Sequence, residues 1–95
     1  MPVETRPYDS ARYLDSDEAV AAYMEAAFET GDAAFIAHAF GIAARARGMT
    51  QIAKDAGLSR ESLYRALGEN GNPEFSTVLK VAKALGLRLT TVAAE

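Results

Sequence analysis

The sequence "IAKDAGLSRESLYRAL", residues 52–67, decides the fold that we expect for this chain. Its first part has a helical pattern that stops at Gly57, which is placed to take the left-handed conformation of a helix C-terminal cap. Leu58 then faces inward, and Ser59 can cap a second helix that runs to Leu67. Two short helices joined by a tight turn with glycine form the helix-turn-helix arrangement.

The second of these helices separates polar from apolar side chains. At about 100° per residue, the apolar side chains at 63, 66 and 67 face the preceding helix, and a polar arc of roughly 140° faces outward. In helix-turn-helix proteins the N-terminal part of this helix enters the major groove of DNA. Arginine can pair with guanine, glutamate with cytosine, and tyrosine can touch a thymine methyl group or a phosphate, while hydroxyl groups near the helix start can position phosphates. The predicted DNA-binding residues of this helix are Ser59, Arg60, Glu61, Ser62, Tyr64 and Arg65.

The same polar arc also has a purely structural explanation. Glu61 and Arg65 are spaced to form a surface ion pair, which is worth about 0.3–0.5 kcal/mol on a helix. An amphipathic helix needs a polar face in any case. The DNA-binding prediction therefore depends on the glycine turn that precedes the helix.

Outward from this stretch, the chain has the pattern of further helices. Asp15 or Ser16 can cap a helix that ends at Gly31, and Asp32 can cap the next one, which ends at Gly48. The turn formers of "ENGNPEF", residues 69–75, precede a helix at 76–85. The buried stripe predicted for the helix after the Asp32 cap consists of Phe35, Ile36, Ala39, Phe40 and Ala43.

The two ends of the chain are expected to be extended. The alternating, β-branched stretch "LRLTTVA", residues 87–93, predicts a short C-terminal strand. A lone strand needs a partner, which the extended N-terminus or a second subunit can supply. The fold class that we expect is therefore all-α, with about five helices, an extended N-terminus and a short C-terminal strand.

The chain's 95 residues are enough for one domain, and its charge is unevenly distributed. Residues 1–38 hold eight Asp or Glu against two Arg, whereas residues 39–95 hold eight Lys or Arg against five Asp or Glu. We divide the domain into an acidic segment with its helix at 1–31, a helix-turn-helix core at 32–86 and the strand at 87–93. The two charge balances indicate different partners for the two parts.

The composition argues against catalysis and against a metal site. The chain has no cysteine and a single histidine, His38, so a transition-metal site lacks ligands. It has no Gly-rich phosphate loop and no nucleophile motif. No apolar run approaches the ~20 residues of a membrane helix, and "MPVETRPYDS" has no apolar core of a signal peptide. We therefore expect no enzyme, no cofactor, no membrane partner and a cytoplasmic location.

The residues quoted first resemble the Xre/lambda-repressor class of helix-turn-helix domains, in which an aliphatic–Ala pair is followed by Ala-Gly-aliphatic and a small polar residue. The longer "RGMTQIAKDAGLSRESLYRALGENGNPEFSTVLKVAKALGLRL", together with the leading "YDSARYLDSDEAVAAYMEAAFETGD", resembles a narrower group, the addiction-module antidote proteins of the HigA-like kind. The resemblance covers roughly residues 8 to 90. It implies a lambda-repressor-like fold and a bacterial antitoxin of a type II toxin–antitoxin module. Such proteins bind and silence a small ribonuclease-type toxin and, as dimers, repress the operon that they share with it.

One position departs from the pattern of the repressor class. That class carries a glutamine three residues before the aliphatic–Ala pair, where this chain has Met49, and the glutamine here is Gln51. Two residues along a helix rotate a side chain by about 200°, so the usual phosphate contact does not transfer directly to Gln51. Thr50 and Gln51 stay predicted DNA contacts because they lie at an exposed helix start. Asn72, in the "GNP" that matches the antidote pattern, can donate to phosphate or serve the turn before Pro73, and both explanations stay open.

The acidic part of the chain suits a basic partner. Toxins of the group that the chain resembles are generally basic because they handle RNA, and an acidic surface speeds association with such a protein. We predict that the N-terminal region supplies toxin contacts, with tyrosines as apolar anchors and carboxylates at the rim. The alternative is that this helix only packs against the rest of the chain or against a dimer mate. The predicted toxin-binding residues are Tyr8, Tyr13, Asp15, Asp17, Glu18, Glu25 and Glu29.

Three functions remain open on the sequence. The first is an antitoxin that both represses and neutralises, with operator DNA, a cognate small basic toxin and a second copy of the chain as partners. The second is a free-standing Xre-type transcription regulator with no toxin. The third is a protein-binding module that keeps the helix-turn-helix for packing and has lost DNA binding, which the acidic net charge of −3 slightly favours.

Overall fold

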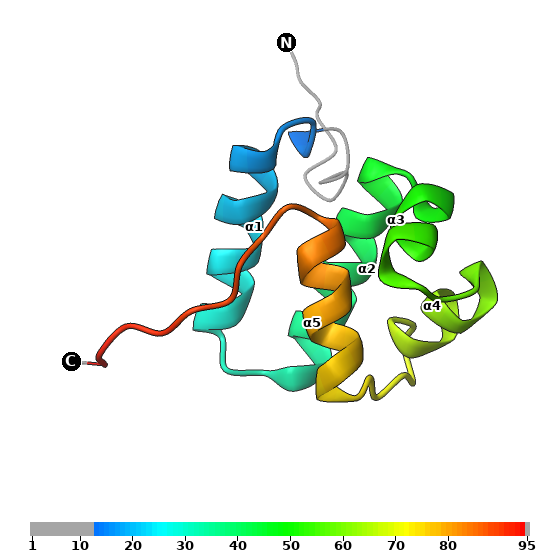
Figure 1. The fold of residues 1–95 in the computed structure, drawn as a ribbon. Coiled ribbons are helices and arrows are strands. Elements are labelled where there is room, and N and C mark those ends of the chain that lie inside the picture. Colours follow the sequence, from blue (N-terminus) through cyan, green and yellow to red (C-terminus); the bar gives the residue numbers. More distant parts are fainter. Residues whose placement is uncertain (1–12, 95) are drawn as a thin grey trace, which may run out of the picture.

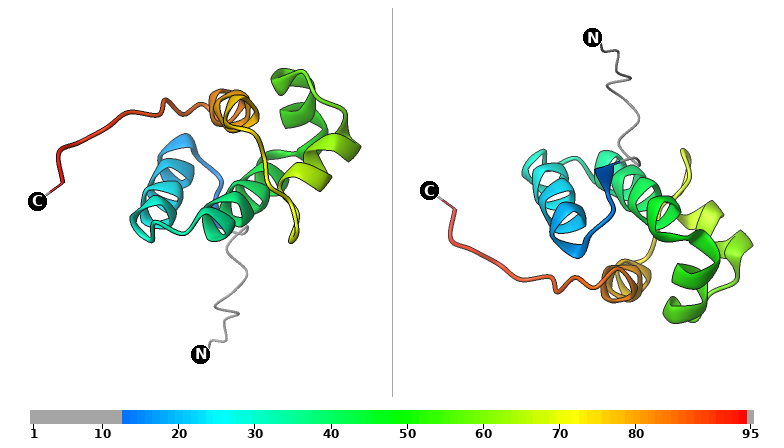
Figure 2. Two further views of the ribbon diagram at one scale, coloured as in Figure 1. Left: turned by 90° about the horizontal axis from the view of Figure 1, so that it is seen from below. Right: turned by 90° about the horizontal axis from the view of Figure 1, so that it is seen from above.

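The computed structural model describes residues 13–94, and over these residues the chain is all-helical. Figure 1 shows the first helix at one end of the molecule, the last helix in the middle and the two short helices at the other end. The two further views in Figure 2 keep the first helix and the two short helices at opposite ends. The described helices are α1 (Asp17–Glu29), α2 (Ala33–Arg47), α3 (Met49–Ala56), α4 (Arg60–Ala66) and α5 (Phe75–Ala84).

The helix starts follow the capping signals of the sequence. Ser16 caps α1, Asp32 caps α2 and Ser59 caps α4, each through a side-chain oxygen that accepts from backbone N–H groups of the first turn. These three caps confirm the predicted helix starts, and Ser16 rather than Asp15 is the cap of α1. α5 begins at Phe75, one residue earlier than expected, and the residue before it makes no side-chain cap hydrogen bond.

The turn between α3 and α4 is built on Gly57. This glycine has a φ of 74°, in the left-handed region where other residues are strained. The backbone N–H of Leu58 then donates to the carbonyl oxygen of Ala53 at 2.9 Å, and the Leu58 side chain packs half-buried against the core. α3, this turn and α4 are therefore compatible with a helix-turn-helix.

One apolar core joins all five helices of the described residues. Its largest fully buried side chains are Phe40 of α2, Leu63 of α4, Val20 of α1 and Val81 of α5, and Ile52 adds the contribution of α3. α1 therefore belongs to the same core as α3 and α4, although it lies at the far end of the molecule from α4.

The buried stripe predicted for α2 is wrong at its first position. Phe35 is 47% exposed, whereas Phe40 is fully buried. The first three residues of α2 are all exposed, so the part of this helix that its neighbours cover begins only at Ile36. Helical periodicity gives the side of the helix that a residue faces, but not how far along the helix the neighbouring elements reach.

The predicted C-terminal strand at 87–93 is wrong, because residues 87–94 contain no strand. A strand needs a neighbouring strand to receive its backbone hydrogen bonds, and the described part of the chain offers none. Leu87 and Leu89 instead pack against the core, and the chain then runs away from the body of the molecule, where Val92 is 88% exposed (Figure 1). The extended N-terminus that we expected lies outside the described residues.

Within residues 13–94, no helix is both long and apolar enough to cross a membrane.

Candidate nucleic-acid interface

α4 presents a polar face to solvent and an apolar face to the core. Leu63 and Leu67 are 0% and 4% exposed, respectively. The polar arc runs from the flank of the helix to the side opposite these leucines, at the surface, where a nucleic acid can reach it. Of the predicted DNA-binding residues, Ser62 is half-buried and the others are exposed, namely Thr50, Gln51, Ser59, Arg60, Glu61, Tyr64, Arg65 and Asn72.

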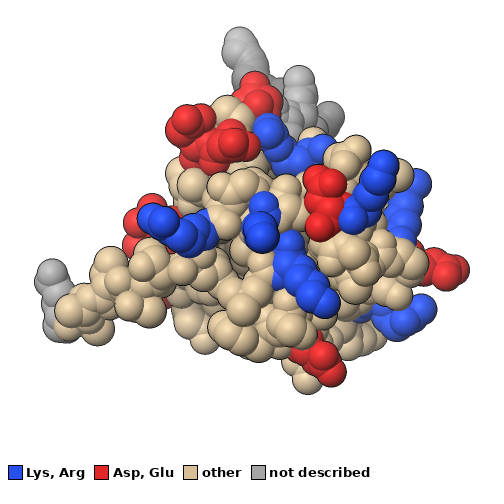
Figure 3. All heavy atoms as spheres, in the orientation of Figure 1, with Lys and Arg blue, Asp and Glu red and all other residues tan. Residues whose placement is uncertain are grey.

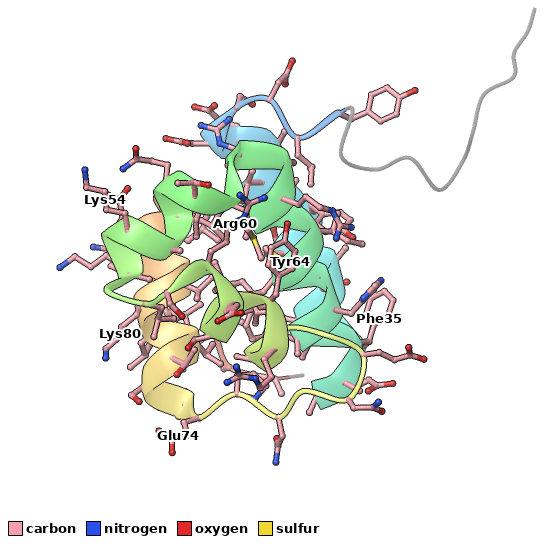
Figure 4. The ribbon with its side chains drawn as sticks, turned by 90° about the vertical axis from the view of Figure 1, so that its right-hand side faces the viewer. Phe35, Lys54, Arg60, Tyr64, Glu74 and Lys80 are labelled. Atoms are coloured by element: carbon pink, nitrogen blue, oxygen red, sulfur yellow. The ribbon has the colours of Figure 1, made fainter. Side chains whose placement is uncertain are left out.

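Arg60 connects α4 to α3. Its Nη1 donates to Oγ1 of Thr50 at 3.3 Å, and its Nη2 donates to the hydroxyl oxygen of Tyr64 at 3.4 Å. The guanidinium carbon also lies 5.6 Å from the centre of the Tyr64 ring, within the range of a cation–π interaction. Figure 4 shows the Tyr64 side chain pointing toward Arg60 in the middle of this face. The structure therefore brings three of the predicted residues together.

The hydroxyl groups at the start of α4 are engaged in the helix cap. The Ser59 oxygen accepts from the backbone N–H of Ser62 at 2.9 Å, and the two hydroxyl oxygens are also 2.9 Å apart. On α3, the Gln51 amide donates to the Asp55 carboxylate at 2.8 Å. These serines and Gln51 thus have structural partners within the chain; the cap at Ser59 was predicted, whereas the bond between Gln51 and Asp55 was not.

Glu61 and Arg65 do not pair with each other in the described structure, where the one ion pair is between Arg47 and Asp17. The structural explanation of the polar arc therefore loses its ion pair and keeps only the general need of an amphipathic helix for a polar face. Both side chains are exposed and project from the outer side of α4. These two side chains can therefore bind a partner whose donors and acceptors complement theirs.

The loop after α4 folds back onto that helix. A Cβ atom added at Gly71 would lie 2.2 Å from the carbonyl oxygen of Ala66, so only glycine permits this close approach. A shallow groove results, and Arg65, Asn70 and Asn72 line it. The loop thus brings Asn72 beside the polar face of α4, and its role in DNA binding stays a prediction beside its role in the turn.

Two lysines that are not among the predicted DNA-binding residues lie at the edge of this face. Figure 4 shows Lys54 of α3 and Lys80 of α5 at its edge, and α3 and α5 pack against each other. In Figure 3, Lys and Arg are spread over the middle and right of the molecule, where some Asp and Glu lie among them, and a cluster of Asp and Glu covers the N-terminal end of α1. The sequence gives both lysines exposed helix positions, but no local signal shows that α3 and α5 share an edge of this surface.

An acidic face lies at the other end of the molecule, on α1. This helix buries Val20 and Met24 against the core. On its solvent side Glu18, Glu25 and Glu29 fall within about 40° of arc at helical geometry, and all three are exposed. They form a single acidic stripe, which we call the α1 glutamate stripe.

The other predicted toxin-binding residues differ in their surroundings. Tyr13 is 65% exposed and Asp15 is exposed, so both are accessible. Asp17 instead accepts a hydrogen bond from the Arg47 guanidinium at 3.1 Å, and this ion pair ties the start of α1 to the end of α2. Tyr8 lies outside the described residues.

The described residues contain no metal-binding arrangement. Within residues 13–94, no three His, Cys, Asp or Glu side chains gather closely enough to hold an ion. His38 is exposed and lines a shallow groove between α2 and α4, together with Ile42 and Tyr64.

The fold and this surface define a small helical protein whose α3–α4 pair is compatible with a helix-turn-helix. The model of the family described as "Probable addiction module antidote protein" matches residues 4–93, and the chain therefore belongs to this family. A protein of Haemophilus influenzae (strain ATCC 51907 / DSM 11121 / KW20 / Rd), described as uncharacterized, is 46% identical over 88 residues, which are 93% of this chain and 91% of that protein. No solved structure matches the chain significantly.

Proposed function

We propose that the chain is the antitoxin of a type II module, of the HigA-like kind, that silences a ribonuclease-type toxin by direct binding and represses its own operon through an Xre-type helix-turn-helix. The observation that carries the proposal is the separation of two unlike surfaces on one small domain. The polar face of α4 lies at one end, and the α1 glutamate stripe lies at the other (Figures 1 and 2). Membership of an antidote family supports the toxin-binding role.

The repressor role is supported by the chemistry of α4. Arginine and glutamate on the exposed face of a recognition helix are residues that can read base edges in the major groove. The acidic net charge does not exclude this role, because salt confines each surface's field to about 10 Å. The acidic stripe and the α4 face can therefore serve oppositely charged partners.

Truncating Arg65 tests the DNA-binding role. We expect Arg65→Ala to weaken binding to the DNA upstream of the chain's own gene by about 1–3 kcal/mol, because a bidentate base contact is lost. Titration of labelled duplex by fluorescence anisotropy measures this, and circular dichroism checks that the helices remain. The matched control is Arg88→Ala, which removes the same charge from the exposed segment after α5. Equal effects of the two substitutions would contradict a base contact at Arg65.

We also propose that the chain acts as a homodimer. One recognition helix buries too little surface for tight specific binding to DNA. Phe75 and Leu79, which are 71% and 43% exposed and four residues apart on α5, leave an apolar area uncovered in the single chain. Sedimentation equilibrium at micromolar concentration is expected to give about twice the mass of one chain. A monomer both free and on DNA would overturn the dimer.

The two binding measurements together separate the functions that the sequence left open. A chain that binds its upstream DNA but no toxin is a free-standing regulator. A chain that binds the toxin but no DNA is a protein-binding module with a helix-turn-helix kept for packing. The proposed antitoxin does both.

A further inference from the structure

We propose that Arg60 contacts a backbone phosphate of DNA and is held for this contact by Thr50 and Tyr64, whereas Glu61 and Arg65 read the bases. This inference rests on the DNA-binding role proposed above. The polar arc of α4 then has two parts with different roles. Arg60 positions the protein on the DNA backbone, and Glu61 and Arg65 read the bases. The observations that carry it are the directions of these side chains on α4 and the hydrogen bonds of Arg60.

The directions follow from the buried residues of α4. Leu63 and Leu67 define its inward side. At about 100° per residue, Arg65 lies opposite this side and Glu61 lies within about 40° of the opposite direction. Arg60 lies only about 40° from the inward direction, on the flank of the helix. Arg65 and Glu61 are therefore aimed away from the protein, whereas Arg60 starts from the side where α4 meets its neighbours.

The hydrogen bonds of Arg60 direct it across that flank to α3. One nitrogen donates to Thr50 in the first turn of α3, and the other terminal nitrogen donates to the Tyr64 hydroxyl, with the guanidinium near the tyrosine ring. A side chain tied to α3 in this way does not extend beyond α4 toward base edges. In helix-turn-helix proteins the first helix crosses the DNA backbone, so a cation held against its first turn is placed for a phosphate.

The guanidinium keeps free donors for such a contact. Arginine has five N–H donors, and the two hydrogen bonds use two of them. The remaining donors can pair with phosphate oxygens, for which the planar fork of arginine is well suited. Because Thr50 and Tyr64 restrict the side chain before DNA arrives, less rotamer freedom is lost on binding. Thr50 and Tyr64 thus act through Arg60 as positioning residues.

The test compares two duplexes over a series of KCl concentrations with the full chain. One duplex carries the DNA upstream of the chain's own gene, and the other has the same composition in scrambled order. Arg60→Ala is expected to weaken both duplexes by the same factor and to lower the salt slope by about one, as the loss of one phosphate contact predicts. Arg65→Ala is expected to weaken only the upstream duplex, by about 5- to 150-fold, which reduces discrimination.

Two further variants test whether Tyr64 and Thr50 position Arg60. Tyr64→Phe keeps the ring and removes the hydroxyl, and Thr50→Val keeps the shape and removes the acceptor. Each is expected to weaken both duplexes several-fold, with unchanged discrimination, and to have no further effect in the Arg60→Ala background, because both act through that side chain.

Two results would overturn the inference alone. The first is a loss of discrimination in Arg60→Ala equal to that in Arg65→Ala, which would make Arg60 a base reader. The second is a full effect of Tyr64→Phe and Thr50→Val in the Arg60→Ala background, which would make their contributions independent. An unaltered chain that binds neither duplex would instead overturn the DNA-binding role, and this inference with it.

Discussion

Phe40→Ala is expected to lower the free energy of unfolding by about 3–5 kcal/mol. Phe40 is fully buried, and its ring meets that of Phe28 edge-on with centroids 5.9 Å apart. Its removal leaves a cavity where α2 passes through the shared core, in addition to the lost transfer free energy. Because a small domain is stable by only about 5–15 kcal/mol, this loss takes up a large share of the total.

The matched control lies on the same helix. Phe35→Ala removes the same atoms from a position that is 47% exposed, and we expect a loss of less than about 1 kcal/mol. Urea unfolding followed by circular dichroism measures both variants. Equal losses would show that the first turn of α2 is covered to the same degree as its middle, in contradiction to the described core.

Reversing the α1 glutamate stripe is expected to have a large effect on the rate of toxin association. Replacing Glu18, Glu25 and Glu29 by lysine turns an attractive field for a basic toxin into a repulsive one, so we expect association to slow by about 10- to 1,000-fold at low salt. The effect should shrink as the salt concentration rises, because exposed charges are screened. Stopped-flow association with the purified toxin measures the rate.

A second triple reversal separates the stripe from the net charge. Lysine at the exposed positions of Asp55, Glu69 and Glu74 changes the net charge of the chain by the same amount, away from α1. We expect a much smaller effect on the association rate. If the two triple variants slow association equally, or if neither does, the α1 glutamate stripe is not the toxin contact and α1 serves packing alone.

Local signals in the sequence were enough for most of the fold. The caps at Ser16, Asp32 and Ser59 depend on side chains that bond to backbone within three residues, and Gly57 depends on its own conformational freedom. The inward and outward sides of α4 follow from helical periodicity alone, with Leu63 buried as expected. Features of this kind can be derived from a few neighbouring residues.

Features that join distant segments could not be derived in this way. The strand predicted at 87–93 fails because strand formation depends on a partner elsewhere, which no local pattern reveals. Asp17 was predicted at a toxin-binding rim, yet its pairing with Arg47, 30 residues away, gives it a structural role. Thr50 and Arg60 are ten residues apart in the sequence. Their hydrogen bond, which directs Arg60 toward α3, therefore forms only when α3 and α4 have folded against each other.

The separation of the two surfaces has a functional consequence. The α1 glutamate stripe and the polar face of α4 lie at opposite ends of the molecule (Figures 1 and 2). Under the proposed function, this placement lets one chain hold a toxin on α1 while α4 contacts DNA. On this basis, the toxin-bound protein is expected to remain on its upstream DNA.

Neutralisation of a toxin by direct binding is the central claim, and one titration tests it most directly. The protein encoded beside this chain's gene is assayed for RNA cleavage while increasing amounts of the full chain are added. We predict that cleavage falls to zero near one equivalent of chain, because a tight complex sequesters the toxin. Cleavage that continues with a large excess of correctly folded chain would contradict the assignment of the chain as the antitoxin.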